Sequence, residues 1–473
     1  MTNRRARSAA SDSSTLLIIG TMVVAAFIMI LNETIVSIAL PDLAETLDVS
    51  TSSIQWLVSG FLVTMGVIIP ITGFLLDRFA PRHIFLAALS AFTIGTLICA
   101  AAPNFGVLLG GRIVQASGTA VVLPLLMTSV MRLIPAERRG SMMGTISIVI
   151  GVAPALGPTV GGAVLAALTW RWMFWIVLAL ALVLLAIGFA KLHVPVELRP
   201  VPLDVLSVIL SALGFAGLVY GLSAIGQTGG PVPPWAALVV SGVALVLFVS
   251  RQIALQRIDR PLLDLRVLLV GRFRLGLIMS IIVFMALLGA GAVILPVYLQ
   301  RILLHEPFIA GLSLLPGGLA MAAISRPAGS FYDRFGARPL VIPGAIGMTA
   351  ALWCFALLGA DAPLGLVIAC HVLMMFSLGL MMTPLMADAL GALPDRLTSH
   401  GSAIFATLQQ VAGALGAAFL VAVAAIGSNT TTGIPDADGI RLAFEAAGVV
   451  ALLAVITSLF FKSQSRPKLP AID

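Results

Sequence analysis

Two stretches of this 473-residue chain repeat each other at an offset of 256 residues, from position 73 to position 329. The first is Gly73-Phe-Leu-Leu-Asp77-Arg78-Phe79-Ala80-Pro81-Arg82, and the second is Gly329-Ser-Phe-Tyr-Asp333-Arg334-Phe335-Gly336-Ala337-Arg338. Glycine, aspartate, arginine, phenylalanine and the final arginine match at the same spacing, and each stretch follows an apolar run. Two halves of the chain therefore repeat with one orientation. Parallel repeats of this kind are typical of membrane transporters, whose binding site lies between the repeats near the membrane midplane.

The composition around these repeats excludes a soluble protein. Hydrophobic residues make up 60% of the chain and charged residues only 10%, whereas about a quarter of the residues in soluble domains are charged. The formal net charge of +7 is spread too thinly to form a nucleic-acid-binding face. The three cysteines lie in apolar runs without the spacing of a disulfide framework or a zinc site. We expect neither a metal nor a cofactor.

Fourteen apolar runs are long enough to cross a bilayer as helices, which requires roughly 20 mostly apolar residues each. Barrel strands would be about ten residues long with alternating polarity. The fold class is therefore an all-α integral membrane protein. The predicted spans are 16–41, 53–76, 83–101, 106–132, 140–167, 170–192, 204–226, 235–255, 274–300, 308–326, 339–360, 363–386, 398–427 and 440–462.

The distribution of basic residues predicts that both termini are cytoplasmic. With fourteen spans, 23 of the 27 basic residues fall on the side of the termini, and only Arg171, Arg301 and Arg441 fall in the opposite loops. Short cytoplasmic loops carry an excess of Lys and Arg. The excess of arginine over lysine, with abundant alanine and glycine, favours a GC-rich bacterium and its plasma membrane.

The repeat also predicts the domain organisation, namely two six-helix bundles separated by an inserted pair of helices. We expect a cytoplasmic tail at 1–15, a first bundle at 16–193, an inserted hairpin with basic linkers at 194–273, a second bundle at 274–462 and a second tail at 463–473.

Three further motifs carry a resemblance to a known family. They are Leu31-Asn-Glu33-Thr-Ile-Val-Ser-Ile-Ala-Leu-Pro41 in helix 1, Arg112-Ile-Val-Gln115-Ala-Ser-Gly118 in helix 4 and Gly151-Val-Ala-Pro154-Ala-Leu-Gly157-Pro158-Thr-Val-Gly161-Gly162 in helix 5. With the repeated stretches, they make the chain resemble the major facilitator superfamily, and the inserted helices make it similar to the fourteen-helix drug:proton antiporters near the lincomycin-exporter branch. The resemblance implies a monomer in the lipid bilayer that exchanges protons for a lipophilic small molecule.

Glu33 and Arg112 are the candidate proton-coupling residues. An ionised carboxylate at the position of Glu33 costs several kcal/mol unless it is paired or hydrated, so a carboxyl group there can take up and release a proton as its surroundings change. Arg112 is the only base that we place inside the membrane, away from the span ends, and we expect Glu33 or a carbonyl of the first span as its partner. The alternatives are a solvated Glu33 and a purely structural Arg112. Many family members carry the acid at the position of Asn32, about 100° away around the helix.

The two repeated stretches are predicted to be cytoplasmic loops between spans, and the resemblance implies a gate there. Each aspartate would bind a neighbouring helix terminus or arginine in one state and release it in the other. The alternative is that these charges only set the topology. Ala80 replaces the usual glycine, which leaves the geometry of the first turn open. The candidate gate residues are Asp77, Arg78, Arg82, Asp333, Arg334 and Arg338.

Helix 5 carries small residues and prolines where a lipid-facing helix would carry leucine. Small residues let two helix backbones approach closely, and proline bends a helix. The resemblance implies that this is the antiporter motif, a tight and bendable seam against the other half. No Gly-Lys-Ser/Thr follows, so a phosphate-binding loop and ATP as fuel are excluded. The seam residues are Gly151, Pro154, Gly157, Pro158, Gly161 and Gly162.

His371 in helix 12 is a second candidate for a titrating group, and the alternative is a histidine that is hydrogen-bonded across helices. Aromatic and polar residues on the other helices are candidates for the substrate cavity, although packing explains such aromatics equally well. They are Phe27, Asn32, Trp56, Phe61, Gln115, Phe284 and Gln300.

These observations predict export of a lipophilic small molecule by alternating access, driven by the proton gradient. The alternative on the same fold is a facilitator or a proton symporter for a metabolite. No pairing of a nucleophile with a base is present in the sequence, so we do not expect an enzyme.

Overall fold

The structure is a computed structural model that describes residues 2–191, 203–224, 232–428 and 435–461; the side chains of residues 2–15, 51, 52, 155, 158, 191 and 307 also lie outside the described part. Regular structure within these ranges is helical, which confirms the predicted fold class. Among the described residues, thirteen helical spans are long and apolar enough to cross a membrane, and a helix bent by 42°, Ala136–Pro154 with Thr159–Ala167, makes a fourteenth if it is counted as one span. The side of the membrane on which the termini lie remains a prediction.

The first bundle contains the spans before residue 192. They are α1 (Thr2–Thr46), α3 (Trp56–Ile68) with α4 (Thr72–Arg78), α5 (Pro81–Ala100), α6 (Phe105–Leu133), α7 (Arg139–Ala167) and α8 (Arg171–Lys191). A short helix α2 (Thr51–Ile54) precedes α3. Glycines allow α5 and α6 to pack closely, because a Cβ on Gly118 would collide with the backbone of Ala88 and Phe92.

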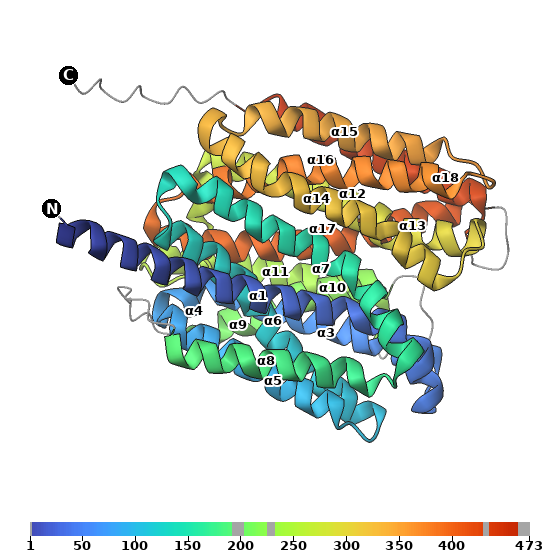
Figure 1. Cartoon of the computed structure of the whole chain (residues 1–473), viewed down its shortest axis with the longest axis horizontal. Coiled ribbons are helices and arrows are strands. Elements are labelled where there is room, and N and C mark those ends of the chain that lie inside the picture. Colours follow the sequence, from blue (N-terminus) through green and yellow to red (C-terminus); the bar gives the residue numbers. More distant parts are fainter. Residues whose placement is uncertain (1, 192–202, 225–231, 429–434, 462–473) are drawn as a thin grey trace.

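The second bundle begins with α12 (Gly271–Leu287), which continues through π-helical turns and α13 (Leu295–Val297) to Ile302. It continues with α14 (Pro307–Phe335), α15 (Arg338–Ala356), α16 (Leu364–Gly391), α17 (Thr398–Gly427) and α18 (Ala437–Ser458). The first and second bundles lie side by side in Figure 1.

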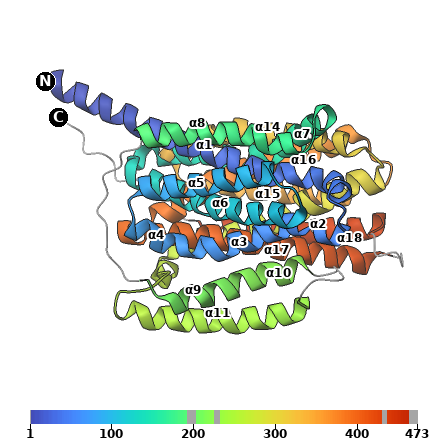
Figure 2. The same cartoon turned by 90° about the horizontal axis from the view of Figure 1, so that it is seen from below.

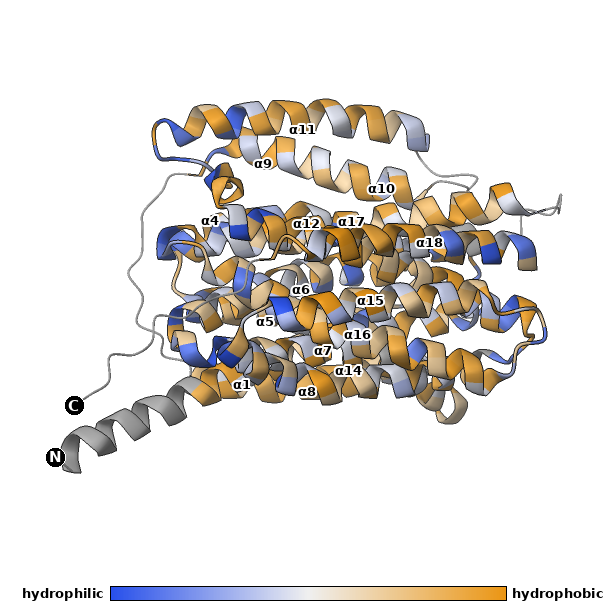
Figure 3. Cartoon of the chain, turned by 90° about the horizontal axis from the view of Figure 1, so that it is seen from above, coloured by the Kyte–Doolittle hydropathy of each residue, from blue (hydrophilic) through white to orange (hydrophobic). Residues whose placement is uncertain are grey.

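The inserted helices form a separate layer. They are α9 (Val205–Ser211) and α10 (Gly217–Ser223), which are joined by a π-helical segment into one span, and α11 (Pro234–Gln256). In Figure 2 this hairpin lies against α3 of the first bundle and α17 of the second. Its outer helix exposes Val239, Val243 and Val246. Figure 3 shows that hydrophilic residues gather at the ends of the helices and that apolar surface lies between them, as lipid requires.

The repeated stretches were predicted to be loops, and this prediction is wrong. Asp77 lies in the last turn of α4, and α14 continues past Arg326 to Phe335, so that Asp333 lies in its last turn. The two helices end differently. Gly336 has φ 81°, a conformation that favours glycine, whereas the corresponding Ala80 is extended with φ −62° and precedes Pro81 at the first position of α5. Alanine is therefore tolerated in the first stretch.

Candidate transport site and gate

Arg112 is fully buried in the first bundle, where three helices hold its guanidinium group. Its Nε donates a hydrogen bond to the Leu57 carbonyl of α3 (3.3 Å), and one terminal nitrogen donates to Asn32 Oδ1 of α1 (3.2 Å) and to Gln115 Oε1 of α6 (3.2 Å). The guanidinium carbon lies 4.2 Å from the centre of the Phe61 ring, a cation–π contact. Gln115 in turn donates to Thr96 Oγ1 of α5 (2.8 Å). The charge is thus held by neutral groups.

The prediction of the hydrogen-bond partner of Arg112 is wrong. The guanidinium binds the side chain of Asn32 and a carbonyl of α3, not Glu33 or a carbonyl of α1. The reason is helix geometry, since one residue turns the side chain by about 100°. Glu33 is half-buried and makes neither a hydrogen bond nor an ion pair with any described residue.

Two buried polar atoms of this cluster lack partners within the described part of the chain. They are Nδ2 of Asn32 and the second terminal nitrogen of Arg112. Unpaired buried donors carry a desolvation cost of about 1–3 kcal/mol, more for a charged group. The cluster therefore holds a fixed positive charge with unused hydrogen-bonding capacity, and the adjacent Glu33 carboxyl group is bound by none of the described residues.

The two repeated aspartates each contact the opposite half of the molecule, at what we call the basic end, where α4 and α14 stop and α7 and α17 begin. Asp333 is buried, and its two carboxylate oxygens accept hydrogen bonds from the backbone N–H groups of Gly140 (2.8 Å) and Ser141 (3.0 Å). These groups belong to the first turn of α7, whose free N–H groups and dipole attract an anion. The second half is thereby attached to the first.

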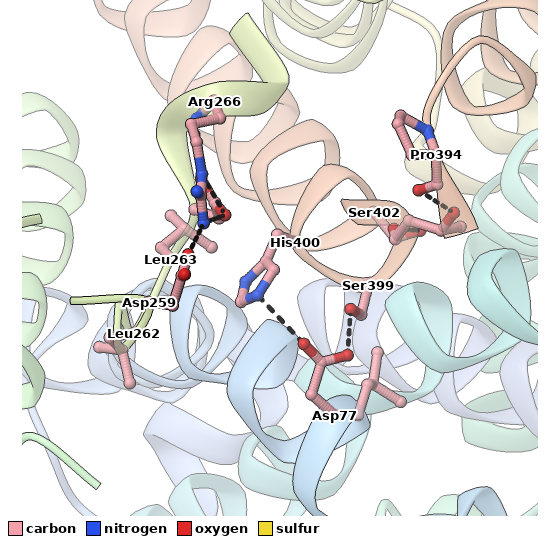
Figure 4. A network of polar contacts seen from close by, with 12 residues as sticks. Asp77, Asp259, Leu262, Leu263, Arg266, Pro394, Ser399, His400 and Ser402 are labelled. Carbon is pink, nitrogen blue, oxygen red and sulfur yellow. Dashed lines mark hydrogen bonds and ion pairs between the residues drawn. The ribbon is translucent and has the colours of Figure 1, made fainter. Parts of the chain in front are cut away.

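Asp77 makes the corresponding contact in the other direction. One carboxylate oxygen accepts a hydrogen bond from Ser399 Oγ and one from Arg132 (3.3 Å), and the other lies 3.1 Å from His400 Nε2. Figure 4 shows Ser399 and His400, at the start of α17, reaching Asp77 of α4. Both aspartates thus bind the first turn of a helix from the other half, but Asp77 binds side chains where Asp333 binds the backbone.

Two of the basic residues predicted for the gate contact groups of their own bundle. Arg82 donates to the Phe189 carbonyl of α8 (3.0 Å) within its own bundle, and Arg78 lies over the rings of Phe74 and Phe79. Arg334 and Arg338 are exposed.

The small-residue motif of residues 151–162, which lies in α7, divides its contacts between two neighbouring helices. A Cβ on Gly151 would collide with Met321 of α14 in the other half, whereas Gly157 and Gly161 face Thr34 and Ile35 of α1 in the same half. Gly162 lies near Phe308 of α14. The 42° bend falls between Pro154 and Thr159; the side chain of Pro158 lies outside the described part.

The remaining candidates do not gather in one place. His371 is buried against Gly317, and its Nδ1 has no hydrogen-bond partner among the described residues. Trp56 stacks on Tyr220 of the inserted hairpin at 5.6 Å between ring centres. Asn32, Phe61 and Gln115 meet at Arg112. Phe27 is half-buried, Phe284 is buried and Gln300 is exposed.

Several contact residues could not be identified from the sequence. His400, Ser399 and Arg132 stand in no repeated motif, and the hydrogen bond from Thr383 to Ser147 (3.0 Å) joins α16 to α7 across the two halves. Gly140 and Gly144 lie in α7 before the motif of residues 151–162. Both pack closely against α14, whereas Gly157 and Gly161 of the motif face α1 instead.

Comparisons with known proteins agree with this architecture. Residues 22–417 match the family model of the Major Facilitator Superfamily. The chain is 39% identical over 458 residues to the lincomycin resistance protein LmrB of Listeria monocytogenes, covering 94% of this chain and 96% of that protein. It is 29% identical to a multidrug resistance protein B homolog of Mycobacterium tuberculosis, covering 85% and 74%. Among solved structures, the proton:xylose symporter XylE superposes with a TM-score of 0.66 at 17% identity, covering 96% and 97%.

The chain therefore belongs to the major facilitator superfamily. It is a multi-pass membrane transporter for small molecules rather than an enzyme, and its relatives include drug-resistance proteins.

Proposed function

We propose that this protein exports lipophilic small molecules, with a lincomycin-like drug as one substrate, in exchange for protons. The observation that supports proton coupling is the half-buried Glu33 one residue from Asn32, which binds the fixed charge of Arg112 (3.2 Å). In our proposal Glu33 takes up a proton from the outside and releases it to the cytoplasm. One charge that moves down a potential of 100 mV yields about 2.3 kcal/mol, and the pH gradient adds to this.

The two Asp contacts form the cytoplasmic gate in this proposal, with the basic end in the cytoplasm of a bacterial cell. The bundles of residues 16–193 and 274–462 rock against each other, and the hairpin of residues 194–273 accompanies them. In this proposal the gate is closed when Asp77 and Asp333 both bind helix starts of the opposite bundle, and these contacts support it. Opening requires that both contacts break, while the glycines of α7 allow α14 to move against it.

Transport in proteoliposomes tests the proposal. Purified wild-type protein is expected to accumulate labelled lincomycin in the lumen when an imposed pH gradient drives protons outwards. The lumen is expected to become more alkaline in step with drug uptake. The glutamine of Glu33→Gln is neutral and cannot take up and release a proton. This variant is expected to lose gradient-driven accumulation of the drug but to retain drug exchange without a gradient. The matched control is Glu137→Gln at an exposed position of the basic end.

Two outcomes would contradict the proposal. Gradient-driven accumulation by Glu33→Gln with unchanged proton flux would remove Glu33 from the coupling step. Proton movement in the same direction as the drug, or drug flux that is indifferent to the gradient, would instead indicate a symporter or a facilitator.

A further inference from the structure

A polar pocket at the basic end lies between the two halves of the molecule and is separate from the Asp77 contact. Its volume is about 240 Å³. One wall is formed by Ala136 and Arg139 at the start of α7 in the first half, and the other by residues of α12, α14 and α16 in the second. Arg272, Tyr332 and Arg334 supply the polar groups of that second wall. The pocket therefore brings three guanidinium groups from both halves to one space.

The positive charge of this pocket is only partly compensated. Arg272 forms an ion pair with Asp388, to which the Tyr332 hydroxyl also donates a weak hydrogen bond (3.5 Å). Arg139 uses its Nε on the Ile134 carbonyl (3.0 Å), and no described residue binds its two terminal nitrogens. Arg334 has no hydrogen bond or ion pair with any described residue. The neighbouring carboxylate of Asp333 is directed to the start of α7. Three cations thus stand beside two carboxylates, of which Asp388 pairs with Arg272 and Asp333 binds the N–H groups of α7.

The free donors match a phosphate group. Guanidinium groups present N–H pairs that bind phosphate oxygens in a bidentate manner, and these charge-assisted bonds are stronger than neutral ones. Basic pockets between helices at the cytoplasmic face are also known to bind anionic lipid headgroups. Beside the arginines, the rings of Phe331 and Phe335 lie 4.4 Å apart between their centres with their planes tilted by 37°, and they expose 41% and 55% of their surface. These rings offer an apolar surface for acyl chains next to the charged pocket.

We propose that this pocket binds the phosphodiester of an anionic phospholipid and that the bound headgroup holds the two halves together at the basic end. One phosphate contacts Arg139 of the first half and Arg334 and Arg272 of the second. Since the lipid binds only where both walls are near each other, it favours the conformation that is closed at this end. This inference does not depend on proton coupling or on the drug that is carried.

Thermal unfolding of the purified full-length protein tests the proposal directly. The probe is short-chain phosphatidylglycerol, with short-chain phosphatidylcholine of the same chain length as the zwitterionic reference. A ligand that binds only the folded state raises the unfolding temperature with its concentration. We expect phosphatidylglycerol to stabilise the wild type and phosphatidylcholine not to. Arg334→Gln and Arg139→Gln, tested separately, each remove a charge-assisted hydrogen bond. Each variant is therefore expected to need about ten times more phosphatidylglycerol for the same rise in unfolding temperature.

Arg396→Gln is the matched control, because Arg396 is exposed near the basic end but does not line the pocket. It is expected to respond as the wild type does. Equal responses of wild type, Arg334→Gln and Arg139→Gln to phosphatidylglycerol would overturn the proposal. Inorganic phosphate and glycerol 1-phosphate form a second arm. If they stabilise the wild type as strongly as the lipid at equal concentration, a soluble phosphate and not the membrane is the ligand, and the lipid assignment is overturned.

Discussion

At the scale of single residues, the hydrogen bond between Asn32 and Arg112 is the contact on which the buried charge depends most directly. Asn32 is fully buried and supplies one of three acceptors to a guanidinium group that is itself fully buried. Asn32→Leu keeps a similar size but removes the acceptor, and the charge cannot recover the loss from water. A hydrogen bond to a charged group is worth about 1.5–3 kcal/mol. We expect a lower unfolding temperature in detergent.

Ser117→Ala is the control for this variant. Ser117 lies on the same helix as Arg112, but its hydroxyl only donates to the Ile113 carbonyl of its own helix (3.0 Å). Its loss is expected to leave the unfolding temperature close to that of the wild type. A similar decrease for Ser117→Ala and Asn32→Leu would mean that any polar loss on these helices destabilises the protein and that the contact with Arg112 has no special weight.

The sequence predicts which residues of the candidate site lie inside the protein, but it does not predict which of them contact each other. A lone arginine in an apolar run must face the interior, so the placement of Arg112 was predictable. Its partner was not, because Asn32 and Glu33 differ by one step of helix rotation and a sequence does not show how a helix is rotated against its neighbours. His400 was not predicted because no repeat or spacing distinguishes it from other histidines near helix ends.

At the scale of helices, the inserted hairpin is fastened by Asp204. This residue caps α9 by accepting a hydrogen bond from the N–H group of Ser207 (3.1 Å), and it forms a bidentate ion pair with Arg251 of α11 (2.7 Å for each bond). The hydrogen bonds from Arg251 are the main reason why the pKa of Asp204 is lowered to about 2, although desolvation acts against them. The contact therefore persists throughout the physiological pH range.

Hydrogen exchange of α9 and α11 provides the measurement for this contact. Because the pKa is lower in the folded state than its ordinary value of 3.8, the stabilisation is present above about pH 4 and is lost as the pH falls towards 2. Asp204→Asn retains a good capping side chain but removes the ion pair, whereas Asp204→Ala removes both. We expect faster exchange in Asp204→Asn and still faster exchange in Asp204→Ala, where the lost cap adds about 1 kcal/mol.

Exchange in these helices that is unaltered in both variants would show that packing against α3 and α17 alone holds the hairpin. The stack of Trp56 on Tyr220 would then be the dominant contact. α5, which makes none of these bonds, serves as the internal control, and its exchange is expected to be the same in all three proteins.

Helices were more predictable than their ends. Apolar runs of about 20 residues can only be spans, because lipid offers no partner for open backbone groups. The polar last turns of α4 and α14 were predicted to be loops, since hydropathy falls where the helix leaves the hydrocarbon, although its backbone hydrogen bonds continue. The bend of α7 was predictable from its prolines, but the division of its glycines between α14 and α1 depends on the tertiary arrangement.

At the scale of the whole molecule, the two Asp contacts are related by the internal repeat, and each attaches a helix of one half to the start of a helix of the other. Rigid-body rocking has to break both in the same step. Their contributions to the opening equilibrium are therefore expected to add as free energies, so that the effects of the two mutations on the open population multiply. Flexible halves that open at one contact at a time would give no such product.

Labelling of Thr383→Cys measures this population, because Thr383 is fully buried between the halves, where it donates a hydrogen bond to Ser147. The experiment uses a protein in which Cys99, Cys354 and Cys370 are replaced by alanine. Asp77→Ala and Asp333→Ala are each expected to speed maleimide labelling about tenfold, and the double variant to approach the product of the two factors, since each lost charge-assisted contact is worth roughly 1.4 kcal/mol or more. Asp438→Ala, at an exposed site in the first turn of α18, is expected to label as the parent does. If either single variant alone reaches the rate of the double variant, one contact carries the closure and the two halves do not open as rigid bodies held at both places.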